Sequence, residues 1–119
     1  MDSGEATTSI CLTGWRLPTS GSHIDNYSFG KLTNAYGITG SSIGSSDSAL
    51  LVSPLFFARS GNISFAFQSL NNVGSSANYW SSKASSSSGA YNLNFGSTSV
   101  YASDYTSKNY GFLIRCVAL

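Results

Sequence analysis

The two cysteines constrain this chain more than any other feature of its sequence. Cys11 and Cys116 stand near opposite ends of 119 residues, so they allow a single disulfide and no zinc constellation. A bridge would close a loop of about 100 residues and contribute roughly 4–5 kcal/mol in the chain-entropy model. The alternative is two buried free thiols. The small-polar composition favours the disulfide, because it is typical of secreted proteins.

Composition allows one domain of ordinary build, over residues 1–119 with a polar N-terminal tail at about residues 1–8. Apolar residues make up 41% of the chain, whereas charged residues make up 9% and the net charge is +1. Such a low charge predicts no basic surface for nucleic acid and no acidic tail. Ser, Thr, Asn and Gly must then keep the chain in solution, which suits an extracellular, cell-surface or virion-associated protein.

The sequence contains no segment that resembles a membrane anchor or a signal peptide. No window approaches the roughly 18 apolar residues of a spanning helix, so we expect no membrane insertion. The first ten residues, "MDSGEATTSI", lack the basic and apolar regions of a leader. We therefore expect either a removed leader or an excised domain.

The first half of the chain carries the helix signals. Apolar residues at three- and four-residue spacings predict a helix from Ser22, as its N-cap, to a stop at Gly37. A second, short helix is predicted to begin after Ser46 or Asp47 and to end before Pro54. One or two short helices are therefore expected.

The second half of the chain is typical of antiparallel strands. "LFFARSGNISFAFQSL" predicts a hairpin around its Ser-Gly-Asn turn. "ANYWSSK", "AYNLNFGS", "SVYASDY" and "GFLIRCVAL" predict further strands, "ICLTGWRLP" predicts a short one near the start, and the serine tract at 85–88 reads as a hairpin loop. The fold class is thus α+β, with small antiparallel sheets and one or two short helices.

Alternation within "AYNLNF" separates two faces of one strand. Tyr91, Leu93 and Phe95 are expected to face the core, whereas Asn92 and Asn94 are expected to face water. Trp15 and Trp80 are interpreted as packing residues. Further core side chains are expected at Phe112 and Ile114.

The segment from about residue 79 to 110 is the candidate binding region. Its tyrosines alternate with Asn, Ser and Thr, and this mixture gives antibody loops contact area together with adaptable hydrogen bonding. The alternative is an ordinary exposed antiparallel strand, which would have a similar composition.

Residues for catalysis or metal binding are sparse. His23 has no acidic neighbour closer than Asp25, so a nucleophilic triad is not expected. The five acids stand singly along the sequence, which argues against paired carboxylates or a calcium cage. "GSSIGSS" lacks the lysine of a phosphate loop. We therefore expect no enzyme, no metal and no cofactor.

Three motifs resemble a known family. "CLTGWRLPT", "NYWSS" and "GFLIRCVAL" resemble the C-x-x-G-W-x-L-P, YWSS and R-C-V blocks of bacterial surface domains with the C-type lectin-like fold, such as the Fibrobacter major paralogous domains. The resemblance implies that fold, with the chain ends closing on adjacent strands and Cys11 bridged to Cys116.

The same fold, in the branch related to formylglycine-generating enzymes, is used by the variable proteins of diversity-generating retroelements. In those proteins, mutation at template adenines scrambles asparagine codons in the C-terminal segment and so diversifies a ligand-binding surface. By position and composition, the residues of this chain that match such sites are Asn92, Asn94, Ser97, Ser99, Tyr101, Ser103, Asp104, Tyr105, Ser107 and Asn109. Tyr79, at the start of the candidate binding region, is a further expected ligand-binding residue.

The chain departs from the families it resembles in two respects. The calcium motifs EPN, QPD and WND of sugar-binding lectins do not occur here, so calcium-dependent sugar binding is not implied. Formylglycine-generating enzymes hold both working cysteines in the C-terminal part of the domain, unlike Cys11 and Cys116, so oxidase activity is not implied either.

Two hypotheses for function follow. The chain is expected to be a recognition module for a protein or cell-surface ligand. The alternative is a structural domain of a bacterial, archaeal or phage surface protein without a separate ligand. A degenerate enzyme of the formylglycine-generating branch is disfavoured by the positions of the cysteines and acids.

Overall fold

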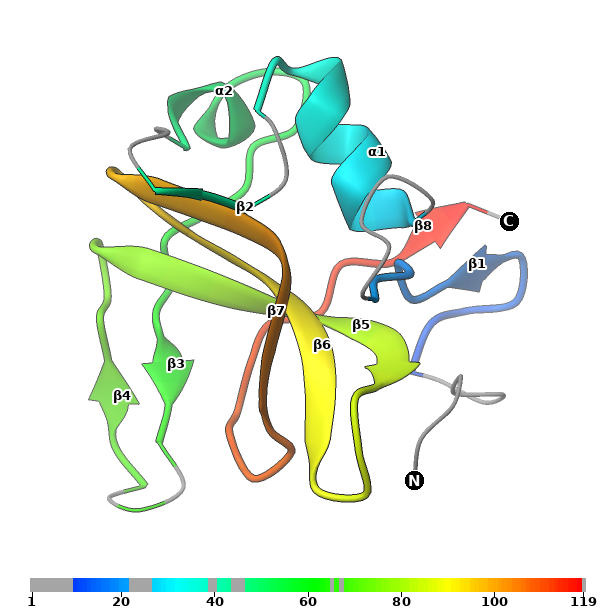
Figure 1. The fold of residues 1–119 in the computed structure, drawn as a ribbon, viewed down its shortest axis with the longest axis vertical. Helices are drawn as coiled ribbons and strands as arrows, with labels where there is room; N and C mark the ends of the chain where they lie inside the picture. The colour runs from blue at the N-terminus through cyan, green and yellow to red at the C-terminus, as the bar shows by residue number, and fades with distance from the viewer. Residues whose placement is uncertain are drawn as a thin grey trace.

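A computed structural model describes residues 10–21, 27–38, 41–43, 47–64, 66 and 68–118 of the chain. Small antiparallel sheets combine there with two short helices in an α+β arrangement (Figure 1). Neither helix is long and apolar enough to cross a membrane in this part of the chain. The elements in order are β1 (Trp15–Arg16), α1 (Ser28–Ala35), β2 (Ser41–Ile43), α2 (Ser48–Leu51), β3 (Asn62–Ile63), β4 (Leu70–Asn71), β5 (Ser76–Ala84), β6 (Gly89–Gly96), β7 (Ser99–Ser107) and β8 (Val117–Ala118).

The main sheet has four antiparallel strands in the order β2-β7-β6-β5. β5, β6 and β7 coincide closely with three of the predicted strands, and the serine tract at 85–88 forms the loop between β5 and β6 as expected. Opposite residues share a face, so the pairs Tyr79–Leu93 and Phe95–Val100 lie on one side. That side meets buried side chains from the helical half of the chain, Phe29, Ile38, Leu50 and Phe57, in the main core.

Helix α1 begins later in the chain than the sequence indicates. It starts at Ser28, where the Thr19 and Ser28 hydroxyls lie 2.9 Å apart and Thr19 Oγ1 accepts the Ser28 N–H at 2.9 Å. The predicted N-cap, Ser22, lies outside the described residues. The predicted stop is confirmed, because Gly37 adopts a φ of +75° just past the helix and its N–H donates to the Asn34 carbonyl.

Helix α2 begins directly after Asp47, as predicted, but Asp47 does not cap it with its side chain. Its fully buried carboxylate instead accepts two hydrogen bonds from Arg59, at 2.8 and 2.6 Å. This bidentate pair ties the start of α2 to the segment before β3. It also raises the pKa of Arg59 above its ordinary value, because the hydrogen bond with Asp47 favours the charged guanidinium.

The predicted Ser-Gly-Asn hairpin turn is wrong. β3 pairs with β4, so the turn lies between Ile63 and Leu70 rather than at residues 60–62. Gly61 instead forms a parallel bridge with Ala77 and donates its N–H to the Ser76 carbonyl at 2.9 Å. The aromatic run before it does not form a strand, because Phe57 is drawn into the core.

The C-terminal segment passes between β3 and β5. Gly111 exchanges two 2.9 Å hydrogen bonds with Ile63, while Leu113 donates to Asn78 and accepts from Trp80, each at 3.0 Å. Of the described residues in the predicted long last strand, Val117–Ala118 alone form a named strand, which pairs with β1. Ile114 is 39% exposed, so its expected place in the core is wrong.

The predicted disulfide is confirmed. Cys11 and Cys116 are bonded, with Cα atoms 5.8 Å apart across 105 positions of sequence. Directly beside the bridge, β1 pairs with β8 through Trp15–Ala118 and Arg16–Val117. The two ends of the described chain therefore meet, as Figure 1 shows at β1 and β8. Trp15, expected to pack, is 51% exposed.

Candidate functional site

A β-bulge in β7 determines which predicted binding residues share a face. Asn92 pairs with Asp104 and Asn94 pairs with Tyr101, so β7 contains one extra residue between these two pairs. All four side chains therefore lie on the face opposite the core, which we call the amide face. Tyr91 and Tyr105, which also pair, lie on the core side of the sheet.

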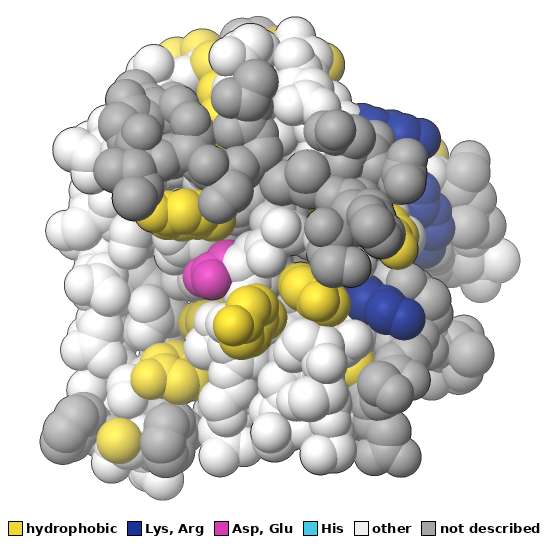
Figure 2. All heavy atoms as spheres, in the orientation of Figure 1, with side chains coloured by type: hydrophobic (Ala, Val, Ile, Leu, Met, Phe, Trp, Pro, Cys, Tyr) yellow, Lys and Arg dark blue, Asp and Glu magenta, His cyan; other side chains and the backbone are white. Residues whose placement is uncertain are grey.

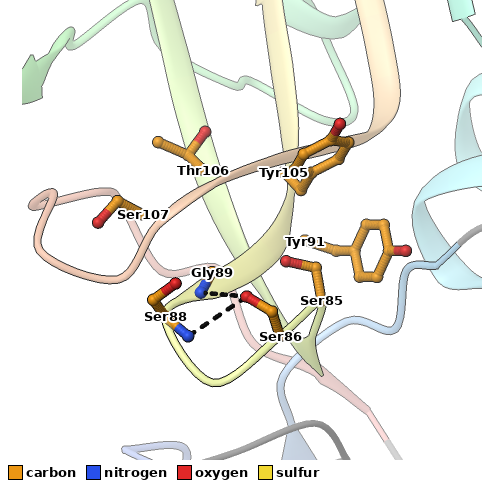
Figure 3. A pocket seen from close by; sticks show the side chains of 8 residues that line it. All are labelled: Ser85, Ser86, Ser88, Gly89, Tyr91, Tyr105, Thr106 and Ser107. Atoms are coloured by element: carbon orange, nitrogen blue, oxygen red, sulfur yellow. Dashed lines mark hydrogen bonds between the residues drawn. The ribbon is translucent and has the colours of Figure 1, made fainter.

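Beyond the core, the sheet carries a pocket that we call the hydroxyl pocket (Figure 3). Its volume is about 460 Å³, and it opens where the β5–β6 loop meets the end of β7. The lining side chains are tyrosines and small hydroxyl-bearing or glycine residues. They are Ser85, Ser86, Ser88, Gly89, Tyr91, Tyr105, Thr106 and Ser107.

Two tyrosines form the aromatic wall of the hydroxyl pocket. The rings of Tyr91 and Tyr105 meet edge to face, with centroids 6.2 Å apart and planes at 75°. Tyr105 is nevertheless 69% exposed, whereas Tyr91 is half-buried. The pair presents a fixed aromatic surface to solvent, with the phenolic hydroxyls available for hydrogen bonding.

The opposite wall is a loop ordered by its own hydrogen bonds. Ser86 Oγ accepts the N–H groups of Ser88 and Gly89, at 3.3 and 3.0 Å (Figure 3). Lys108, just after β7, donates its N–H to the Ser88 carbonyl at 2.8 Å and its Nζ to the Ser87 carbonyl at 3.0 Å. These bonds fix the loop against the end of β7, so the pocket is formed before any ligand arrives.

The amide face is held by a buried network rather than displayed in full. Asn78 Nδ2 donates to Asn92 Oδ1 at 3.0 Å, and Asn92 Nδ2 donates to Thr106 Oγ1 at 3.2 Å. Asn92 is 0% exposed, so its predicted display is wrong. The physical reason is that neighbouring polar side chains on β5 and β7 satisfy its amide.

Tyr79 is also misplaced by the sequence prediction. Its ring is 7% exposed and stacks on Phe95 with centroids 5.9 Å apart. Its hydroxyl accepts the Ala58 N–H at 3.3 Å. Tyr79 is therefore a core residue, because strand alternation places half-buried Trp80 on the amide face and turns Tyr79 toward the core.

Asp104, half-buried on the amide face, is the acid of the predicted set. Burial raises the pKa of its carboxyl, and a hydrogen bond from the Tyr105 backbone offsets part of that rise. It forms no ion pair with a described side chain. Phe112, expected in the core, is half-buried, and its ring lies 4.3 Å from that of Trp80 and 5.7 Å from that of Tyr110 between centroids.

The predicted residues do not form one patch. Tyr105 and Ser107 lie in the hydroxyl pocket, whereas Asn94, Tyr101 and Asp104 lie on the amide face. Ser97 and Ser99 flank the turn at the other end of β6 and β7, and Ser103 is half-buried in β7. Asn109 is exposed in the turn after β7.

Sequence reasoning missed the loop wall of the hydroxyl pocket and the part that Tyr91 takes in the aromatic wall. It recognised Ser85–Ser88 as a loop but gave it no role, and it assigned Tyr91 to the core. A signal was present in the sequence. The loop at 85–88 leads directly into β6, so the strand that pairs with β6 must end beside this loop. In the structure that strand is β7, and its last residue, Ser107, lies opposite Gly89.

The chemistry within reach is recognition by hydrogen bonds and aromatic contact. In the described part of the chain, no three His, Cys, Asp or Glu side chains gather as metal ligands would. His23 lies outside the described residues. Figure 2 shows one face of the molecule, where several separate hydrophobic patches in yellow lie among white atoms of the backbone and of uncharged side chains.

Comparisons with protein-family models, curated proteins and solved structures each find no match to this chain.

Proposed function

We propose that this chain is a recognition module with a C-type lectin-like fold, which binds a protein or cell-surface ligand through the hydroxyl pocket. One observation carries the proposal. Tyr105 is 69% exposed yet held edge to face against Tyr91, in a pocket otherwise lined by small hydroxyl-bearing and glycine residues. A large aromatic side chain kept in solvent on an ordered wall is a common anchor in protein interfaces.

The arrangement of the chain ends supports the proposed fold. The Cys11–Cys116 bridge and the β1–β8 pair close the termini, and the C-terminal segment then passes between β3 and β5. The motif resemblance implies closure of this kind.

Diversification of the kind used by retroelement variable proteins is part of the proposal. Three residues of the predicted set lie at least partly in solvent: Tyr105 and Asn109 are exposed, and Ser107 is half-buried. Their replacement would change the surface at little cost to the stability of the fold. The test is the surrounding DNA. A reverse-transcriptase gene and a near-copy of the 3′ coding region, differing chiefly at adenines, would support diversification, and their absence would contradict it.

The binding proposal is tested on an array of extracellular proteins and glycans. The purified domain is compared with Tyr105→Ala and with Tyr36→Ala, which removes a 37% exposed tyrosine that neither lines the pocket nor belongs to the predicted set. We expect to find ligands whose signal falls at least tenfold with Tyr105→Ala, about 1.4 kcal/mol, and persists with Tyr36→Ala. Absence of ligands, or signals unchanged by Tyr105→Ala, would contradict the proposal.

A structural role is favoured by one other observation. The β3–β4 hairpin exposes Ile63 at 49%, Leu70 at 63% and nearby Val73 at 60%. Such a cluster could pack against a neighbouring domain. A Leu70→Ser variant on the same array separates the two surfaces. Loss of signal with Leu70→Ser, while Tyr105→Ala keeps it, would place the contact on the β3–β4 hairpin instead of in the pocket.

A further inference from the structure

A second cleft shares no lining residue with the hydroxyl pocket. It measures about 510 Å³ and lies between α1 and the β1–β8 pair, which are neighbours in Figure 1. Phe29 and Phe57 in its lining are buried, while Leu32 and Leu55 are half-buried. Trp15 lines it too and is 51% exposed. We call it the basic cleft.

Two cations line this apolar cleft. Lys31 is an exposed residue of α1, and the Arg115 guanidinium lies 4.3 Å from the centroid of the Phe57 ring. The described part of the chain contains two acids, and neither lines the cleft: Asp47 is bonded to Arg59, and Asp104 lies on the amide face. Figure 2 shows basic side chains gathered on the side where Figure 1 places α1, β1 and β8.

The lining of the basic cleft favours a ligand whose main part is an alkyl chain. Ser28 supplies the only hydroxyl in the described lining. That hydroxyl already contacts Thr19 at 2.9 Å and accepts a hydrogen bond from Arg16 at 3.3 Å. A sugar or peptide body would leave most of its polar groups without partners here, whereas an alkyl chain would bury apolar surface at little cost.

We propose that the basic cleft binds a free fatty carboxylate of medium length. The acyl chain lies against Phe29, Leu32 and Leu55, and the carboxylate is paired by Lys31 and Arg115. A volume of about 510 Å³ falls within the usual range of small-molecule sites. This site is separate from the proposed recognition function and stands or falls without it.

The probe is decanoate, titrated by calorimetry into the whole domain and followed by tryptophan fluorescence. Decyltrimethylammonium, which has the same alkyl chain and the opposite charge, is the matched ligand. We expect decanoate to bind and the ammonium compound to bind at least tenfold more weakly. Equal affinities, or no decanoate binding at millimolar concentration, would overturn the proposal.

Variants then place the ligand. Lys31→Gln should weaken decanoate about fivefold, while Lys108→Gln, which removes the same charge beside the hydroxyl pocket, should leave it unchanged. Trp15→Phe should abolish the fluorescence response, and Trp80→Phe should retain it. An equal loss with both lysine variants, or a response that depends on Trp80 instead of Trp15, would overturn the site.

Discussion

At the scale of single residues, a network of side-chain hydrogen bonds among Asn78, Asn92 and Thr106 links β5, β6 and β7, in addition to their backbone pairing. Its bonds measure 3.0 and 3.2 Å, and Asn92 at its centre is 0% exposed. A central amide that both donates and accepts is costly to remove, because each partner is then left unsatisfied in a buried place.

We therefore predict that Asn92→Ala lowers the free energy of unfolding by about 1–3 kcal/mol. Asn94→Ala, two positions along the same face of β6 and half-buried, should change it by no more than about 0.5 kcal/mol. Urea denaturation of both variants is the measurement. Equal losses would show that the network contributes nothing beyond ordinary burial.

Asp104 gives stability a pH dependence of a definite sign. Burial raises the pKa of this carboxyl in the folded state, so ionisation penalises folding at neutral pH. The penalty is complete above the folded pKa and disappears below the unfolded pKa of about 3.9. Asp104→Asn should therefore be more stable than the parent at pH 7 and lose that advantage by about pH 3. Denaturation at both pH values checks this, and a variant less stable at pH 7 would contradict it.

At this scale the sequence is a poor guide to exposure. Polar identity and strand alternation together place Asn92 in water, and nothing local reveals that Asn78 and Thr106 will satisfy its amide. Leu93 and Phe95, both 0% exposed, could be predicted because apolar side chains need no specific partner to be buried.

At the scale of elements, Gly61 fixes how the β3–β4 hairpin attaches to β5. Its φ is +74°, and a Cβ there would collide with the Asn71 carbonyl oxygen and lie 2.9 Å from the Val73 nitrogen. Gly74 has a similar φ of +81° but open space where a Cβ would sit. The two glycines therefore separate backbone strain from steric conflict.

We predict that Gly74→Ala costs about 1–2 kcal/mol through strain at positive φ. Gly61→Ala should cost about 2–5 kcal/mol, because crowding of about 1–3 kcal/mol is added to the same strain. Thermal and urea unfolding of both variants give the comparison. If Gly61→Ala were no worse than Gly74→Ala, the close approach of Gly61 to β4 would be wrong.

Elements with strong alternation could be predicted, and connections could not. β5, β6 and β7 follow from their aromatic residues and, in β6, from the alternation of apolar and amide side chains. The Ser-Gly-Asn turn could not be rejected from sequence, because a glycine at this position fits a turn that needs a positive φ. Gly61 does have a positive φ, but it lies in a parallel bridge with Ala77 instead of in a hairpin turn. The register shifts in β5 and β7 depend on neighbours distant in sequence.

At the scale of the whole molecule, the two chain ends are joined by a covalent bond and a very short sheet. β1 and β8 contribute two residues each, which is too little pairing to close the chain by itself. The bridge between Cys11 and Cys116 spans 105 positions, so it restricts nearly the whole unfolded chain.

We accordingly predict that the Cys11→Ala, Cys116→Ala double variant loses about 4–5 kcal/mol of unfolding free energy, mainly because its unfolded state gains entropy. The double variant leaves no free thiol to exchange or oxidise. Guanidinium denaturation against the oxidised parent gives the value, and treating the parent with reductant should reproduce it. Domains of this kind are stable by only about 5–15 kcal/mol, so the variant should be marginal at 37 °C and regain stability on cooling. A loss under about 1 kcal/mol would mean that β1, β8 and the core already hold the ends together, and that the bridge does not determine the stability of the fold.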